Sequence, residues 1–237
     1  GVLFLFLGAI WCPAALGQAK PNVLMIAIDD LRPALGCFGD ETAITPNIDR
    51  LAKRGMVFQR AYCQQAVCCP SRLSMLTGLR PDTIRVWDLK THFREAKPDA
   101  VTLPQYLKNT GYHSRSIGKI LHGGGKPSKD PESWSVPPMH DNVRDPKLRY
   151  ALPDNLKGNG LKRAASELAG VPDEHYIDGI VARDSIRVMG ELAANKQPFF
   201  LAIGFRKPHL PFNAPKKYWD LYGRQKIPLP KHSEHPV

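Results

Sequence analysis

Charged and imidazole side chains follow three predicted strands of the sequence, just after each strand ends. The strands cover residues 22–28, 112–118 and 198–205, and the polar residues that follow them are Asp29, Asp30, Lys119, His122 and His209. The first and the last are short continuous apolar runs, which are typical of parallel strands buried in the middle of a sheet and covered on both faces. Because open α/β sheets bind ligands at the carboxyl ends of their strands, we expect these side chains to converge on one site.

The two adjacent carboxylates favour a metal site. Asp29 and Asp30 would repel each other unless a cation neutralised them, and hard divalent ions such as Ca2+ or Mg2+ take carboxylate oxygens as ligands. The simpler alternative is that the aspartates cap a helix. Taken alone, Lys119 is also compatible with a solvated surface lysine, and His122 or His209 with a hydrogen-bonded structural histidine.

Two adjacent cysteines begin the sequence CCPSRLSMLTG, which covers residues 68–78. Since proline favours the first turn of a helix, we expect a helix that opens at Pro70, with Cys68 just before it, where backbone N–H groups attract anionic species. Neighbouring cysteines do not easily bond to each other, and the chain lacks the paired C-x-x-C spacing of a zinc site. The pattern favours a reactive centre at Cys68, with a structural role for the pair as the alternative.

Predicted helices alternate with the apolar runs. A helix is expected over residues 45–55 with Thr45 as its N-cap, and another over residues 102–111 that opens with a capping box at Thr102. The longest is expected over residues 174–195, with one apolar stripe formed by Ile177, Val181, Val188 and Leu192. This alternation predicts an α/β fold with a central, mostly parallel sheet flanked by helices.

The stretch between residues 123 and 172 lacks this alternation. It is dense in Gly, Pro and Ser, and irregular loops longer than about 12 to 15 residues are usually functional or disordered. We expect a surface excursion beside the active edge of the sheet.

The first residues and the cysteines are informative about the cellular compartment of the protein. Residues 1–19 are largely apolar and end in small residues, which predicts part of a signal peptide and an exported protein, with an N-terminal membrane anchor as the alternative. We expect no stable membrane insertion. In an oxidising compartment, three complete disulfide pairings remain open for the other cysteines, namely Cys37, Cys63, Cys68 and Cys69.

The 237 residues include 33 Lys and Arg against 22 Asp and Glu, a formal net charge of +11. This balance favours polyanionic partners such as nucleic acid, an anionic membrane or an acidic polysaccharide. No basic helix, zinc-finger spacing or aromatic RNA-binding motif accompanies it, so nucleic-acid binding is not expected. A solvated basic surface is the alternative.

Taken together, the motifs resemble the type I sulfatases. Cys68, Pro70 and Arg72 fit the C-x-P-x-R signature of that family. NVLMIAIDDLRPALGCFGD, TPNIDRLAKRG, GKILHGG and FFLAIGFRKPHLPF stand in the family's order and are most similar to the iduronate 2-sulfatase branch. The resemblance implies an alkaline-phosphatase-like α/β sandwich and hydrolysis of sulfate esters on a sulfated sugar or glycosaminoglycan-like polysaccharide. It also implies a secreted or periplasmic location, or a lysosomal one in a eukaryote.

The same resemblance implies how the nucleophile is made. Cys68 would be oxidised to formylglycine by a separate formylglycine-generating enzyme, and the hydrated aldehyde would attack sulfur. Cys69 would occupy a variable position of the motif. Asp29, Asp30 and the modified Cys68 would bind Ca2+, in preference to Mg2+.

Four further roles follow from the resemblance. Arg72 would hold the nucleophile, and Lys119 would bind sulfate. His122 would handle protons on the diol, while His209 would contact the sulfate or protonate the departing oxygen. The family supplies its other metal ligands and a second sulfate-binding lysine further along the chain. We therefore expect residues 20–237 to be the N-terminal part of a sulfatase catalytic domain whose C-terminal subdomain is missing.

Two other functional classes remain open. A phosphodiesterase or phosphonate hydrolase of the same superfold would share the aspartates, and a non-catalytic binder of sulfated glycans would fit the basic charge.

Overall fold

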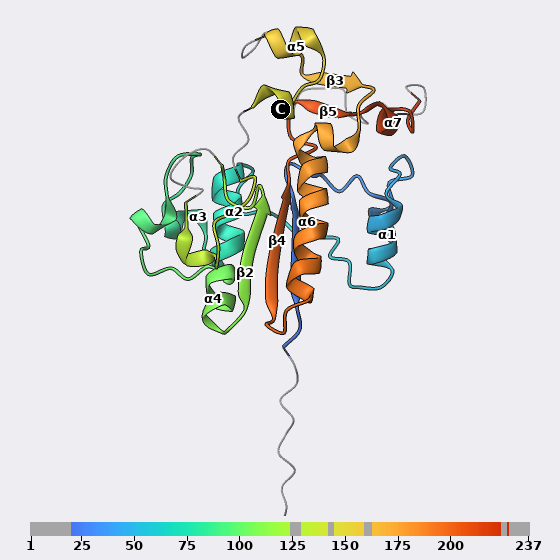
Figure 1. Ribbon diagram of the computed structural model, residues 1–237. Coiled ribbons are helices and arrows are strands. Elements are labelled where there is room, and N and C mark those ends of the chain that lie inside the picture. The colour runs from blue at the N-terminus through green and yellow to red at the C-terminus, as the bar shows by residue number, and fades with distance from the viewer. Residues whose placement is uncertain (1–19, 124–128, 142–144, 159–162, 224–226, 228–237) are drawn as a thin grey trace, which may run out of the picture.

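A parallel sheet of three strands forms the centre of the computed structural model, which describes residues 20–123, 129–141, 145–158, 163–223 and 227. The strands are β1 (Val23–Ile28), β4 (Phe199–Phe205) and β2 (His113–Gly118), in the order β1-β4-β2 (Figure 1). The predicted signal peptide of residues 1–19 lies outside the described residues. Within the described part of the chain, no helix is long and apolar enough to cross a membrane.

The central strand is β4, and its apolar residues are buried along almost its whole length. It pairs with both neighbours, so that Phe200 lies opposite Val23 of β1 and Ser114 of β2. The prediction that β1 is a central strand covered on both faces is wrong. Among the described strands it lies at the edge of the sheet and pairs only with β4. Leu24 and Ile26 on its outer face are 47% and 50% exposed.

Helices cover both faces of the sheet and make a three-layer α/β/α sandwich (Figure 1). On one face lies α6 (Ile177–Ala193), and all four residues of its predicted apolar stripe are buried there. This helix packs on Ile117, Leu201 and Ile203. On the other face, α2 (Cys68–Thr77) and α4 (Leu103–Asn109) pack in a second apolar cluster. The predicted fold class is confirmed.

The remaining elements are short. They are η1 (Gly36–Phe38), α1 (Pro46–Ala52), α3 (Pro81–Ile84), η2 (Phe93–Glu95), η4 (Pro131–Ser133), η5 (Pro146–Leu148), α5 (Pro153–Lys157), β3 (Ser166–Ala169), η7 (Asp173–His175), β5 (Phe212–Pro215) and α7 (Lys216–Trp219).

Of three predicted helix starts, one is confirmed and two need correction. Thr102 forms the expected capping box with Gln105 at the start of α4. The side chain of Thr45, however, does not cap α1. Its hydroxyl instead donates to the carboxylate of Asp49 and accepts a hydrogen bond from Gly36. The third start differs too, because α2 begins at Cys68 itself, so that this residue belongs to the first turn.

The irregular stretch contributes one strand to a second, smaller sheet. β3 pairs in parallel with β5, and the pair lies beyond the carboxyl ends of the central strands (Figure 1). The buried carboxylate of Glu167 organises this region, since it accepts hydrogen bonds from the backbone of Ala151 and Leu152 and from the side chains of Asn155 and Tyr176. The stretch therefore lies beside the predicted active edge, with secondary structure that its composition did not indicate.

Candidate active site

A buried carboxylate lies between two cations at the carboxyl edge of the central sheet. Asp29 follows β1 and is 4% exposed. Its Oδ1 accepts a 2.7 Å hydrogen bond from Arg72 of α2, and its Oδ2 accepts one from Lys119, which follows β2. Burial by itself would raise the pKa of Asp29, but the hydrogen bonds and charges of Lys119 and Arg72 outweigh it and hold the pKa below its ordinary value. Asp29 is therefore ionised at neutral pH.

Two glycines bring Lys119 to this carboxylate. Gly118 has a φ of +77°, and a side chain there would come within 2.1 Å of the Gly204 carbonyl oxygen. A side chain on Gly204 would meet the Lys119 carbonyl at 2.0 Å. The ends of β2 and β4 therefore approach each other more closely than residues with a Cβ atom would allow. Arg72 secures the same turn, because its guanidinium donates to the carbonyls of Lys119 and Ile120.

Cys68 and His209 complete the cluster from two other elements. Cys68 is half-buried at the first position of α2, with its Sγ 3.6 Å from Nζ of Lys119. His209 arrives on the segment after β4. One ligand atom from each of Asp29, Cys68 and His209 lies within 4.8 Å of the other two. The structure thus brings together groups from all three strand ends and from the helix that carries the cysteine motif.

The second cysteine of the pair faces the core. Cys69 is fully buried in the apolar cluster under α2. Burial, followed by the charges of Asp88 and Cys68, raises the pKa of its thiol to about 12, so Cys69 is protonated and shielded from solvent. All four cysteines in the described residues are free thiols.

His122 stands beside the cluster with a buried ring nitrogen. Its Nδ1 has no hydrogen-bond partner among the described residues. Burial and the positive charges of Lys119, Arg72 and Arg206 lower its pKa, against an opposing contribution from Asp29. The imidazole is therefore neutral at neutral pH and can accept a proton.

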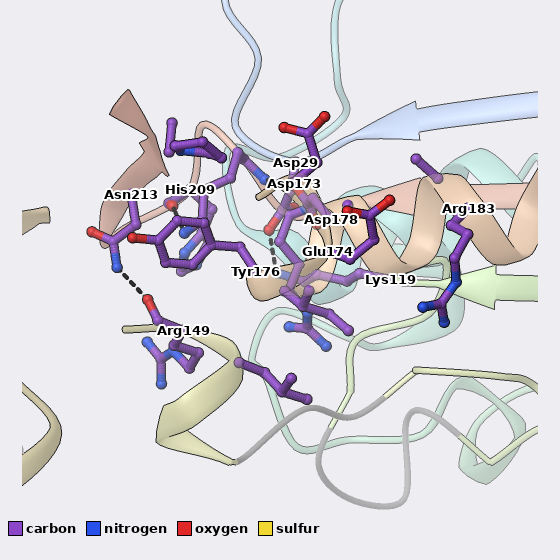
Figure 2. Close-up of a pocket in the computed structure, with 18 of the residues that line it drawn as sticks. Asp29, Lys119, Arg149, Asp173, Glu174, Tyr176, Asp178, Arg183, His209 and Asn213 are labelled. Atoms are coloured by element: carbon purple, nitrogen blue, oxygen red, sulfur yellow. Dashed lines mark hydrogen bonds and ion pairs between the residues drawn. The ribbon is translucent and has the colours of Figure 1, made fainter. Parts of the chain in front are cut away.

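A pocket of about 710 Å3 opens over this edge of the sheet (Figure 2). Sequence analysis anticipated four of its lining residues, namely Asp29, Lys119, His122 and His209. It missed Arg149, Arg206, Lys207, Tyr176 and Asp178. Arg206 and Lys207 directly follow β4, so the strand-end pattern that indicated His209 also applied to them. Arg149 lies in the irregular stretch, where no pattern indicated it.

The protein-family model described as Sulfatase matches residues 21–234. The chain belongs to the sulfatase family. It is 42% identical over 216 residues to iduronate 2-sulfatase of Mus musculus, covering 88% of this chain and 38% of the relative. It is 40% identical over 221 residues to that of Homo sapiens, covering 91% and 40%. The chain thus spans about 40% of the length of these curated relatives.

A solved structure supports the fold assignment. The phosphonate monoester hydrolase of Agrobacterium radiobacter aligns with a TM-score of 0.67 and 22% identity, covering 89% of this chain and 45% of that one. At this identity the match concerns the fold alone.

Asp30 differs from the other residues expected at this sulfatase-type site. Its side chain is exposed and is outside the group formed by Asp29, Cys68 and His209. Its φ of +57° is left-handed, which is uncommon for a residue other than glycine. The backbone turns at this point, so adjacency in sequence does not bring the two carboxylates to one place. Its role as a metal ligand remains a prediction.

The possible metal ligands at this site, Asp29, Cys68 and His209, only partly suit a hard cation. Carboxylate oxygen suits Ca2+, whereas thiol sulfur and imidazole nitrogen suit softer metals. Oxidation of Cys68 to formylglycine would replace the sulfur by oxygen and make the set harder. Both oxygens of Asp29 already bind cationic side chains, so a metal ion would compete with Lys119 for this carboxylate.

Proposed function

We propose that this chain carries the nucleophile of a sulfuric ester hydrolase that acts on a sulfated sugar or glycosaminoglycan-like polysaccharide, in the manner of iduronate 2-sulfatase. The observation that carries the proposal is the position of Cys68, in the first turn of α2, 3.6 Å from Lys119 and grouped with Asp29 and His209. A nucleophile at this position has cations beside it for the sulfate and an imidazole for the leaving group.

Cys68 acts after oxidation to formylglycine by a maturation enzyme. The hydrated aldehyde supplies two hydroxyl groups on one carbon, one to attack sulfur and one to expel sulfate afterwards. Asp29 and the oxidised residue 68 would hold Ca2+, with Asp30 as a further ligand once its exposed side chain turned toward them, and the ion would supply positive charge at the sulfate oxygens. Cys69 takes no part.

The chain's own side chains bind the sulfate and move the protons. Lys119 contacts the sulfate oxygens as a point charge, while Arg72 keeps Asp29 ionised and holds the turn after β2 in place. His122 is neutral and accepts a proton from a hydroxyl of residue 68. His209 contacts the sulfate and donates a proton to the departing sugar oxygen.

Location and maturation belong to the same proposal. Residues 1–19 direct export as a signal peptide, and residues 20–237 form the N-terminal part of the catalytic domain. The enzyme is secreted or periplasmic, or lysosomal in a eukaryote, and the formylglycine-generating enzyme is its partner during maturation.

The deciding experiment uses the complete enzyme, matured at residue 68, on a sulfated disaccharide and an aryl sulfate, with a phosphodiester and a phosphonate monoester beside them. We expect sulfate esters to be hydrolysed fastest. Cys68→Ala should abolish turnover, and Cys69→Ala is the matched control that should retain it. Preferential cleavage of the phosphorus esters would instead identify a phosphodiesterase or phosphonate hydrolase. Tight binding of sulfated glycans without any turnover would identify a binding protein.

A further inference from the structure

Four cationic side chains besides Lys119 line the active-site pocket. Arg183 pairs with a neighbouring carboxylate, which leaves three. Arg206 and Lys207 follow β4 directly. Arg149 enters from the segment after η5, and Figure 2 shows it among the lining residues. Arg149 and both residues after β4 are half-buried. Burial lowers the pKa of both Arg206 and Lys207, and the nearby positive charge of Arg149 lowers it further.

The protein leaves these charges poorly compensated. The carboxylate of Asp178 lies nearby, but its oxygens accept hydrogen bonds from the backbone amides of Arg206 and Lys207 rather than from their side chains. Nε of Arg206 is buried without a hydrogen-bond partner among the described residues. The other polar contacts of the two side chains after β4 are to neutral groups, since Arg206 donates to the Asp141 carbonyl and Nζ of Lys207 donates to two carbonyls of its own loop. Asp173, another carboxylate of the pocket, pairs with Lys217. Partly buried like charges without counterions are unfavourable, so an anion in the pocket would stabilise them.

The backbone at Arg149 is fixed in place. Its carbonyl accepts a hydrogen bond from the side chain of Asn213 on β5, and its N–H donates to Pro146 at 2.9 Å. Two residues further along the chain, the N–H of Ala151 donates a hydrogen bond to the carboxylate of Glu167. Arg149 is therefore presented to the pocket by a braced segment, which lowers the entropic cost of binding a ligand.

We infer that Arg149, Arg206 and Lys207 form a subsite for a second anionic group of the substrate, a carboxylate or a further sulfate, apart from the ester that is cleaved. The inference rests on the proposed function and names its substrate class, a sugar that carries at least two anionic groups. Lys119 and Arg72 already serve the cluster at Cys68, so the three additional cations are not needed there. A guanidinium matches the paired oxygens of carboxylate and sulfate with two parallel hydrogen bonds.

Arg149→Gln in the complete, matured enzyme tests the subsite, with Lys147→Gln as the matched control. Lys147 is exposed on the same turn and does not line the pocket, so both variants remove one positive charge. The substrates are a uronic acid 2-sulfate disaccharide, a neutral disulfated disaccharide and 4-methylumbelliferyl sulfate, which has no second anion.

We expect Arg149→Gln to lower kcat/KM about tenfold to a hundredfold, mainly through KM, for a substrate with two anionic groups. The change for 4-methylumbelliferyl sulfate should be less than about twofold, and Lys147→Gln should affect none of the three. A loss for only the uronate or only the disulfated sugar identifies the recognised group as carboxylate or sulfate. Equal losses on all three substrates, or no loss on any, would overturn the subsite.

Binding provides a readout that does not depend on turnover. In the Cys68→Ala background, calorimetry with the two disaccharides should show the same selective weakening by Arg149→Gln. If Arg149→Gln binds both disaccharides as tightly as its parent while the matured enzyme hydrolyses sulfate esters, the subsite is wrong and the proposed function stands. If the matured enzyme hydrolyses no sulfate ester but binding is weakened selectively, the proposed function fails and the anion subsite stands.

Discussion

The carboxylate of Asp178 accepts a 2.8 Å hydrogen bond from the backbone N–H of Lys207, two residues before His209. The same carboxylate accepts hydrogen bonds of 2.9 and 3.0 Å from the N–H of Arg206. Asp178 lies in the first turn of α6, so the helix that covers one face of the sheet also fixes the segment that carries His209. Burial raises the pKa of Asp178 although these amide hydrogen bonds oppose it.

Asp178→Asn should lower activity through the position of His209. Asparagine has nearly the same size, but its NH2 group replaces one acceptor and would face a backbone N–H. We expect kcat to fall about tenfold with little change in KM, and the free energy of unfolding to fall by about 1 to 3 kcal/mol. Steady-state kinetics and urea unfolding measure the two effects. Glu174→Gln is the control, because Glu174 also lines the pocket but is exposed; equal kcat values for the two variants would argue against the positioning role.

The aldehyde should map to residue 68 and not to residue 69. The C-x-P-x-R signature requires proline and arginine two and four residues after the modified cysteine, and Pro70 and Arg72 satisfy this only for Cys68. The complete burial of Cys69 agrees with that register. Peptide mass spectrometry with hydrazide capture, after co-expression with a formylglycine-generating enzyme, checks it. An aldehyde on residue 69, or on neither residue, would contradict the assignment.

Glu167→Gln should destabilise the small sheet and do so less at low pH. Burial alone would raise the pKa of Glu167, but its hydrogen bonds from Asn155, Ala151, Tyr176 and Leu152 hold the pKa below the ordinary 4.5. Below about pH 4.5 the unfolded chain therefore binds more protons than the folded one, and the stabilisation is lost as pH falls through the folded pKa.

Urea unfolding at several pH values measures this effect. We expect a cost of about 3 kcal/mol at pH 7, because a buried charged acceptor is lost, and a smaller cost below pH 4.5. Glu191→Gln is a suitable control, since the side chain of Glu191 is half exposed and its carboxylate pairs with Arg187 on the same helix. A cost for Glu167→Gln that does not change with pH would show that the carboxylate's charge contributes nothing.

Local periodicity accounts for the parts of the structure that the sequence predicted. The apolar run of β4 and the stripe of α6 have the spacing of their elements, and strand ends necessarily meet at one edge of a parallel sheet. Lys119 and His209 were therefore predictable as neighbours although they are far apart in the chain.

The features that depend on tertiary contacts were not predictable in the same way. The apolar residues of β1 predict a central strand, yet β1 has one paired neighbour in the described sheet. The hydrophobicity of a strand does not specify how many strands pair with it. Asp30 follows Asp29 directly, but it has a left-handed backbone and is outside the group formed by Asp29, Cys68 and His209. Arg149 lines the pocket because hydrogen bonds to Asn213 and Glu167 hold its segment beside the carboxyl edge of the sheet. These partners are distant in the sequence, so no local sequence pattern indicates them.

Cys68→Ser in the complete enzyme tests the mechanism itself. Serine offers one hydroxyl where the matured residue offers two, so attack on sulfur remains feasible beside Lys119, though slower. The serine hydroxyl gives its proton to His122 as its oxygen bonds to sulfur, the bond from sulfur to the sugar oxygen breaks, and that oxygen takes a proton from His209. The second hydroxyl, which His122 deprotonates to expel sulfate, is absent. The sulfate ester should therefore persist on residue 68, with about one alcohol released per enzyme molecule.

Intact-mass analysis and the burst of released alcohol measure this trapping. Cys68→Ala, which has no hydroxyl, is the control and should show neither the added mass of a sulfate group nor a burst. Many turnovers by Cys68→Ser without any sulfated enzyme would contradict covalent catalysis. Direct attack on sulfur by an activated water molecule would then explain the reaction better, because such a route needs no hydroxyl at residue 68 and would leave the Cys68→Ala variant active as well.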